Sequence, residues 1–91
     1  MEKLARSLAG HDKGCVYAVV SEEEGRIALA DGKSRTLERP KYKNVRHVQM
    51  IIRLPDQIRR LLETAVRNED VVHLLRQYGR STDSKEKTLE R

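Results

Sequence analysis

The chain of 91 residues contains neither phenylalanine nor tryptophan, and tyrosine occurs only three times. Hydrophobic residues make up only 37% of the sequence, so its core must be small and aliphatic. A chain of this length favours one domain, near the low end of domain sizes. The shortage of aromatic rings also excludes the kind of stacking platform with which RRM domains read single-stranded bases.

Cysteine is nearly absent as well. Cys15 has no second cysteine with which to form an internal disulfide, and no Cys/His spacing suits a zinc ion. Because the residues that follow it are apolar and no histidine adjoins it, we interpret Cys15 as a small packing residue rather than a reactive thiol. We therefore predict that the protein holds no metal and no other cofactor.

The sequence also lacks the features of a membrane protein, a secreted protein and an enzyme. No stretch approaches the ~20 apolar residues of a membrane span, and residues 1–10 are too polar for a secretion signal. There is no nucleophile beside a histidine, no phosphate-cradling glycine loop and no carboxylate pair in an apolar setting. We expect a cytoplasmic protein without catalytic activity.

What the chain does contain is positive charge. Its formal net charge of +5 favours a polyanionic partner. Between Lys33 and Arg53, seven residues are basic and only Glu38 is acidic, whereas Glu22–Glu24 form an acidic cluster elsewhere. Pro40 restricts the backbone of this basic segment, and we expect its side chains to be solvated. Contacts from lysine and arginine to phosphate supply most of the sequence-independent affinity for nucleic acid.

Apolar residues and turn residues in the first half of the chain predict a small sheet. We expect short strands at residues 4–8, 15–20, 26–30, 34–37 and 45–51. Glu22–Gly25 and Asp31–Gly32 predict tight hairpin turns. The strand at 15–20 is nearly continuous in apolar residues, which is typical of a strand covered on both faces. Five short strands joined by tight turns favour a strongly bent barrel, because closure removes exposed edges. These patterns leave an SH3-like and an OB-type barrel open.

The most informative motif is AGHDKGCVYAVV at residues 9–20, in which a polar loop with two glycines runs directly into an apolar strand. A glycine followed by alternating apolar residues is the signature of the KOW motif. It is matched here by Gly14, Val16, Ala18 and Val20. Over roughly residues 4–50 the chain resembles KOW proteins, which include large-subunit ribosomal proteins, NusG-type elongation factors and small bacterial RNA-binding proteins. The resemblance implies an SH3-like barrel over residues 1–54 whose glycine loop approaches RNA.

The residues that we expect to contact RNA share a basic side chain, an aromatic ring or a place in the glycine loop. They are His11, Lys13, Gly14, Lys33, Arg35, Arg39, Lys41, Tyr42, Lys43 and Arg46. Gly14 meets a backbone demand, either a positive φ or a lack of room for a side chain. Asp12 is expected to close the turn by accepting hydrogen bonds from backbone amides. Tyr42 either stacks on an unpaired base or packs on the barrel edge, and the sequence does not choose between the two.

From Pro55 onward the apolar period changes to that of helices. One stripe comprises Ile58, Leu61, Leu62, Ala65 and Val66, and the next comprises Val71, Leu74, Leu75 and Tyr78. Asn68 starts the second helix and Gly79 ends it, which favours two helices over one bent helix in residues 55–79. Their apolar faces cap the barrel, bind a partner protein or pack as a dimer. Capping is preferred, because the barrel alone buries little apolar area. We predict disorder for the polar residues 80–91.

These patterns predict a non-enzymatic, monomeric RNA-binding protein with a basic face. Its target is expected to be ribosomal RNA, or an assembling or translating ribosome. The alternative is a protein-interaction module that contacts the transcription or translation machinery, as the KOW barrels of elongation factors do. A third interpretation is a structural module that dimerises through the helical faces at 58–78.

Overall fold

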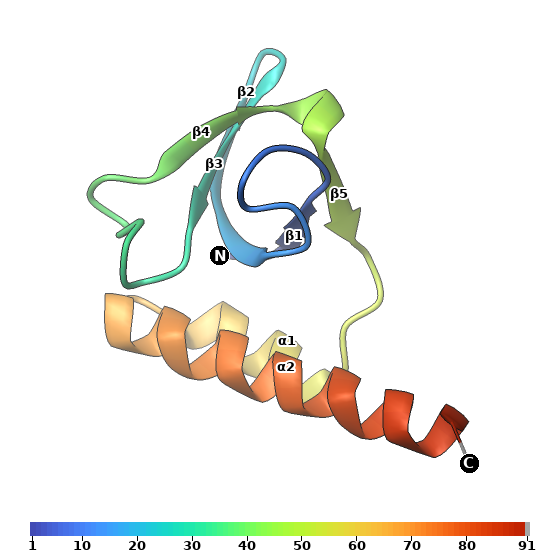
Figure 1. Ribbon diagram of the computed structural model, residues 1–91. Coiled ribbons are helices and arrows are strands. Elements are labelled where there is room, and N and C mark those ends of the chain that lie inside the picture. The colour runs from blue at the N-terminus through green and yellow to red at the C-terminus, as the bar shows by residue number, and fades with distance from the viewer. Residues whose placement is uncertain (91) are drawn as a thin grey trace.

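The computed structural model describes the backbone of residues 1–90 and the side chains of residues 1–81. Antiparallel strands are followed by two helices (Figure 1). The strands are β1 (Leu4–Ser7), β2 (Val16–Glu23), β3 (Arg26–Ala30), β4 (Lys41–Asn44) and β5 (Val48–Ile51). A 3-10 turn, η1 (Val45–His47), precedes β5, and the helices are α1 (Asp56–Thr64) and α2 (Asn68–Glu90). The predicted class, mainly β with a C-terminal helical part, is confirmed.

The strands form one bent sheet in the order β4-β3-β2-β1-β5. No ladder joins β4 to β5 among the described residues, so the predicted closure into a barrel is wrong. The loop of residues 8–15 lies between these two edges instead (Figure 1). The Leu8 amide donates to the His47 carbonyl beside β5, and Nζ of Lys43 on β4 donates to the Ala9 carbonyl, both at 2.8 Å. A loop therefore bridges the gap that strand pairing would close.

Strand β3 has the predicted bounds, and the hairpin predicted at Glu22–Gly25 is present, with Gly25 at a φ of 71°. The strand predicted at 15–20 is β2, and its central residues are covered on both faces, as expected. One face contributes to a cluster on the inside of the bend, formed by Ala5, Tyr17, Val19, Ile27, Leu29 and Val48. The other face, with Ala18, packs beneath the helices.

Residues 31–40 form a long irregular loop, so the tight hairpin predicted at its start and the strand predicted at 34–37 are wrong. The physical reason is the Asp31 carboxylate. One of its oxygens accepts hydrogen bonds from the backbone amides of Lys33 (2.8 Å) and Arg35 (2.9 Å). These bonds bend the chain where a strand would have to be extended.

The basic segment after this loop is a strand rather than the solvated loop that the sequence suggested. Lys41 and Lys43 of β4 are partly buried, whereas Tyr42 and Asn44 on the opposite face are exposed. This alternation is the period of two that a strand requires. After β4, the Asn44 side chain accepts a hydrogen bond from the Arg46 amide and winds the chain into η1, so the last predicted strand begins only at β5.

The two predicted helices are present, and they cover the part of the outer face of the sheet that β1 and β2 form (Figure 1). Their apolar stripes form one cluster with the sheet: Leu4 and Ala18 from the strands, and Ile58, Leu62, Ala65, Val71 and Leu74 from the helical part. The faces that we considered for a partner or a dimer are therefore occupied within one chain. None of the helices in the described part of the chain is both long and apolar enough to cross a membrane.

The connection between the helices departs from the predicted stripe at Val66. Helix α1 ends at Thr64, so Val66 lies outside it and is exposed. The Asp70 carboxylate closes this turn by accepting hydrogen bonds from the amides of Val66 (3.0 Å) and Arg67 (2.9 Å). These two bonds hold the pKa of Asp70 below its usual value.

We predicted that the second helix ends at Gly79. Helix α2 instead continues to Glu90. A glycine inside a helix costs only about 1 kcal/mol relative to alanine, so one glycine does not stop a helix whose neighbours favour it. The disorder predicted for residues 80–91 stays a prediction. Arg91 lies outside the described residues.

Candidate nucleic-acid interface

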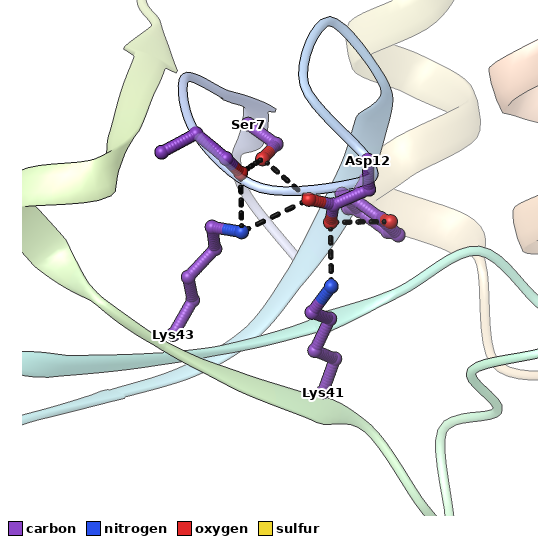
Figure 2. Close-up of polar contacts among 6 residues, drawn as sticks. Ser7, Asp12, Lys41 and Lys43 are labelled. Atoms are coloured by element: carbon purple, nitrogen blue, oxygen red, sulfur yellow. Dashed lines mark hydrogen bonds and ion pairs between the residues drawn. The ribbon is translucent and has the colours of Figure 1, made fainter.

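The Asp12 carboxylate is the centre of a polar network that holds the loop of residues 8–15 (Figure 2). Oδ2 accepts hydrogen bonds from Nζ of Lys41 and from the Tyr17 hydroxyl, both at 2.8 Å. Oδ1 lies 2.9 Å from both Nζ of Lys43 and the Ser7 hydroxyl. Four side chains from β1, β2 and β4 thus converge on one carboxylate. We call this group the Asp12 network.

Lys41 and Lys43 therefore do not have the solvated side chains that we predicted. Only 26% of the Lys41 side chain and 11% of the Lys43 side chain are exposed, against 12% for Asp12. Both extend from β4 toward the loop, as Figure 2 shows. Partial burial of an ammonium group is unfavourable unless a carboxylate or hydrogen bonds compensate it, and here Asp12 supplies both. Two lysines and one carboxylate leave this network with one net positive charge.

The network also corrects the role predicted for Asp12, because its carboxylate bonds side chains and not backbone amides. The hydrogen bond from Lys41, followed by those from Lys43, Tyr17 and Ser7, holds the pKa of Asp12 far below its usual range. Burial, helped by the neighbouring Asp12 carboxylate, raises the pKa of Tyr17. At neutral pH the carboxylate is therefore charged and the phenol is a neutral donor.

Most of the loop of residues 8–15, the glycine loop, is exposed. His11, Lys13 and Gly14 lie on its surface, and Gly14 has a φ of 93° with open space where a Cβ would be. The first of the two reasons proposed for this glycine, a positive φ, is confirmed. Cys15 is also exposed, so its interpretation as a packing residue is wrong. It precedes β2 and therefore lies outside the covered part of the strand.

The loop of residues 31–40 carries three of the predicted RNA contacts, Lys33, Arg35 and Arg39, and all three are exposed. None of them forms an ion pair with any residue whose side chain is described. The loop backbone is nevertheless held locally: the Arg39 amide donates to the carbonyl and the hydroxyl of Thr36, both at 3.1 Å. The cations thus extend from an ordered backbone.

Tyr42 and Arg46 are the remaining predicted residues, and both are exposed. The guanidinium of Arg26, on the neighbouring strand β3, lies over the Tyr42 ring at 5.2 Å from its centroid. Tyr42 remains 49% exposed. This side of β4 therefore presents an aromatic ring with a cation stacked on it, an arrangement that favours contact with planar or anionic groups.

Two segments that are far from the glycine loop in the sequence contact it. Lys41, which directly follows the loop of residues 31–40, bonds Asp12, and His47 at the end of η1 bonds Leu8. The glycine loop with Lys13 therefore lies between the end of the loop that carries Arg39 and the turn that carries Arg46. We use the name convergent basic surface for the exposed side chains that these neighbouring segments carry, namely His11, Lys13, Arg39 and Arg46.

Sequence reasoning named Asp12, Lys41 and Lys43 but missed the contacts between them. The Asp12 carboxylate pairs with two lysines that lie about 30 positions away in the sequence. This pairing can be predicted only if β4 is first recognised as a strand. The alternation of Lys41, Tyr42, Lys43 and Asn44 was the available signal. Arg26 was not singled out either, although it is the first residue of a correctly predicted strand.

Comparison of the chain with protein-family models and with curated proteins found no match.

Proposed function

We propose that this chain is a non-enzymatic RNA-binding protein whose SH3-like KOW domain binds RNA through the convergent basic surface. The observation that carries the proposal is the contact of the glycine loop, which the Asp12 network fixes in place, with β4 and with η1. Arg39 lies just before β4 and Arg46 lies in η1, and both are exposed. The strand order β4-β3-β2-β1-β5 with a 3-10 turn before the last strand supports an SH3-like arrangement. The resemblance of Gly14 and the following strand to the KOW motif supports RNA as the polyanion.

Binding in this proposal depends on phosphate contacts. Exposed lysine and arginine side chains release counterions when they neutralise phosphates, which supplies affinity without sequence preference. Gly14 lets the backbone approach closely, because it adds no side chain at the loop surface. The Asp12 network keeps the loop in one conformation, so less conformational entropy is lost on binding. Tyr42, with Arg26 over its ring, offers one position for stacking on an unpaired base.

The RNA most consistent with this mode of recognition is a structured one, read by shape and backbone. KOW proteins occur among large-subunit ribosomal proteins, so we propose ribosomal RNA, or an assembling or translating ribosome, as the target. Such a protein acts in the cytoplasm.

One observation favours the alternative of a protein-interaction module. Ile52 is 85% exposed at the end of β5. A cavity of about 340 Å³ adjoins it, lined by Met50, Ile51, Leu54 and Arg59 among others. Glu2 and Lys3 complete the lining of this partly apolar site, which lies on segments distinct from the convergent basic surface. The affinity for a protein that binds there through apolar contacts would be insensitive to salt. The affinity for RNA that binds through phosphate contacts would decrease as salt is added.

The test is the salt dependence of binding to a fluorescent RNA hairpin by wild-type protein and by single variants. Lys13→Ala, Arg39→Ala and Arg46→Ala should each weaken binding and flatten the plot of log affinity against log salt by up to roughly 0.9 per lost phosphate contact. Arg60→Ala, an exposed change of equal charge on α1, is the matched control and should leave the slope unchanged. Equal affinities and slopes in all four variants would contradict the proposal.

A further inference from the structure

The loop of residues 31–40 is fastened to the first turn of α2 by one side chain. Oδ1 of Asn68 accepts a hydrogen bond from the Leu37 backbone amide at 2.8 Å. Its Nδ2 donates to Oε1 of Glu38 at 2.9 Å. An asparagine amide makes both contacts at once because it carries a donor and an acceptor on the same group. The loop and the helix are therefore joined across about 30 residues of sequence.

Packing brings the same two segments together. Gly32 has a φ of 82°, and a Cβ at this position would overlap the Asn68 carbonyl oxygen and approach Cγ2 of Val72 to 2.9 Å. Leu37 packs against the apolar cluster beneath the helices. The loop backbone is thus fixed to α2 near its start and near its middle, whereas its basic side chains remain exposed.

We propose that Asn68 is a positioning residue for RNA binding: it fixes the loop of residues 31–40 against α2 and so holds Lys33, Arg35 and Arg39 in the conformation that contacts phosphate. This inference rests on the proposed function. It extends the RNA-binding surface beyond the glycine loop and gives the helical pair a role besides covering the sheet. Asn68 acts through the loop, because its own amide is already bonded to Leu37 and Glu38.

The first test is Asn68→Ala, which removes both hydrogen bonds without changing the net charge. Binding to a fluorescent RNA hairpin should weaken about three- to tenfold, the range expected when a binding loop must be ordered on association. The slope of log affinity against log salt should stay at the wild-type value, because no phosphate contact is lost. Ile58→Val, a neutral change in the core beneath α1, controls for lowered stability alone. It should bind like the wild type.

Two further variants distinguish positioning from a general loss of stability. The double variant Asn68→Asp/Glu38→Gln exchanges donor and acceptor at constant net charge, and it should restore affinity to within about twofold of the wild type. In the Arg35→Ala/Arg39→Ala background, Asn68→Ala should weaken binding by less than about twofold, because most of the positioned cations are then absent.

Wild-type affinity in Asn68→Ala would overturn the inference, as would an undiminished effect in the background that lacks Arg35 and Arg39. An exchange variant that binds no better than Asn68→Ala would also overturn it. In each of these outcomes, salt-dependent binding by the wild type leaves the proposed function standing. A wild-type protein that shows no salt-dependent binding to RNA overturns both.

Discussion

Replacing Asp12 with asparagine should destabilise the fold more than any other change of a single polar side chain in the glycine loop. The substitution preserves the shape of the side chain but removes its charge. Lys41 and Lys43 then face an amide that offers one acceptor instead of two charged oxygens. The hydroxyls of Ser7 and Tyr17, which donate hydrogen bonds to the Asp12 carboxylate, also lose a charged acceptor.

The magnitude follows from the lysines. A hydrogen bond to a charged group contributes roughly 1.5–3 kcal/mol, and Asp12 accepts two from ammonium groups. Because 11% and 26% of the two lysine side chains remain exposed, each ammonium regains some hydration when its partner is lost. We therefore expect a loss of about 2–3 kcal/mol in the free energy of unfolding. For a domain of this size, that is a decrease in Tm of roughly 10–20 °C.

The effect should depend on pH with a definite sign. The pKa of Asp12 is lower in the folded chain than in the unfolded chain. Its stabilising contribution is therefore complete above the unfolded pKa of about 4, and it is lost as the pH falls from there toward the folded value. The difference in Tm between wild type and Asp12→Asn should be largest at neutral pH and should shrink as the pH falls below about 4.

Thermal unfolding followed by circular dichroism at several pH values measures both quantities. Glu23→Gln removes one exposed carboxylate that has no ion pair among the described residues, and it is the control for the change in net charge. A Tm of Asp12→Asn within about 2 °C of the control at neutral pH would refute the stabilising role of the network. So would a difference that is independent of pH.

Three further changes test other parts of the fold. Gly14→Val should lower the Tm, because a β-branched residue is costly at a φ of 93°, and an unchanged melting curve would contradict this. Gly32→Ala should lower the Tm more than Gly25→Ala does, because both positions have a positive φ but only the Cβ at residue 32 would overlap the Asn68 carbonyl. Equal Tm values for these two variants would argue against the contact. A chain truncated after Leu54 should lose cooperative melting, because Leu4 and the rest of the outer face of the sheet would be uncovered; a sharp transition would show that the sheet is stable alone.

The sequence was sufficient for the features that depend on local periodicity. The apolar run in β2 predicted coverage on both faces, and the change of period after Pro55 predicted two helices. These signals are reliable because burial selects apolar residues at fixed intervals along an element. A positive φ at Gly14 was one of the two explanations that the sequence left open, and it is the one observed.

The failures arose where one polar side chain changes the path of the backbone. The Asp31 side chain accepts hydrogen bonds from two backbone amides, and a long loop forms where a tight hairpin was predicted. The Asn44 side chain accepts a hydrogen bond from one backbone amide, and a 3-10 turn begins inside a predicted strand. Neither bond has a periodic signature. Closure of the barrel failed for a related reason: residues 8–15 are long enough to enter the gap between β4 and β5, and Asp12 provides the bonds that keep them there.

The position of Asp12 also changes how the positive charge of this chain should be interpreted. Counting cations along the sequence treats Lys41 and Lys43 as equivalent to Arg39, although both lysines share one partly buried carboxylate and Arg39 has no ion pair with a described side chain. A Glu substitution at either lysine would bring a second carboxylate next to Asp12. It would therefore unfold the loop as well as remove charge, and weaker RNA binding would not identify a phosphate contact. Arg39→Glu leaves the Asp12 network intact, so it should weaken RNA binding at an unchanged Tm. A fall in Tm for Arg39→Glu comparable to that of Lys43→Glu would mean that Arg39 also stabilises the fold.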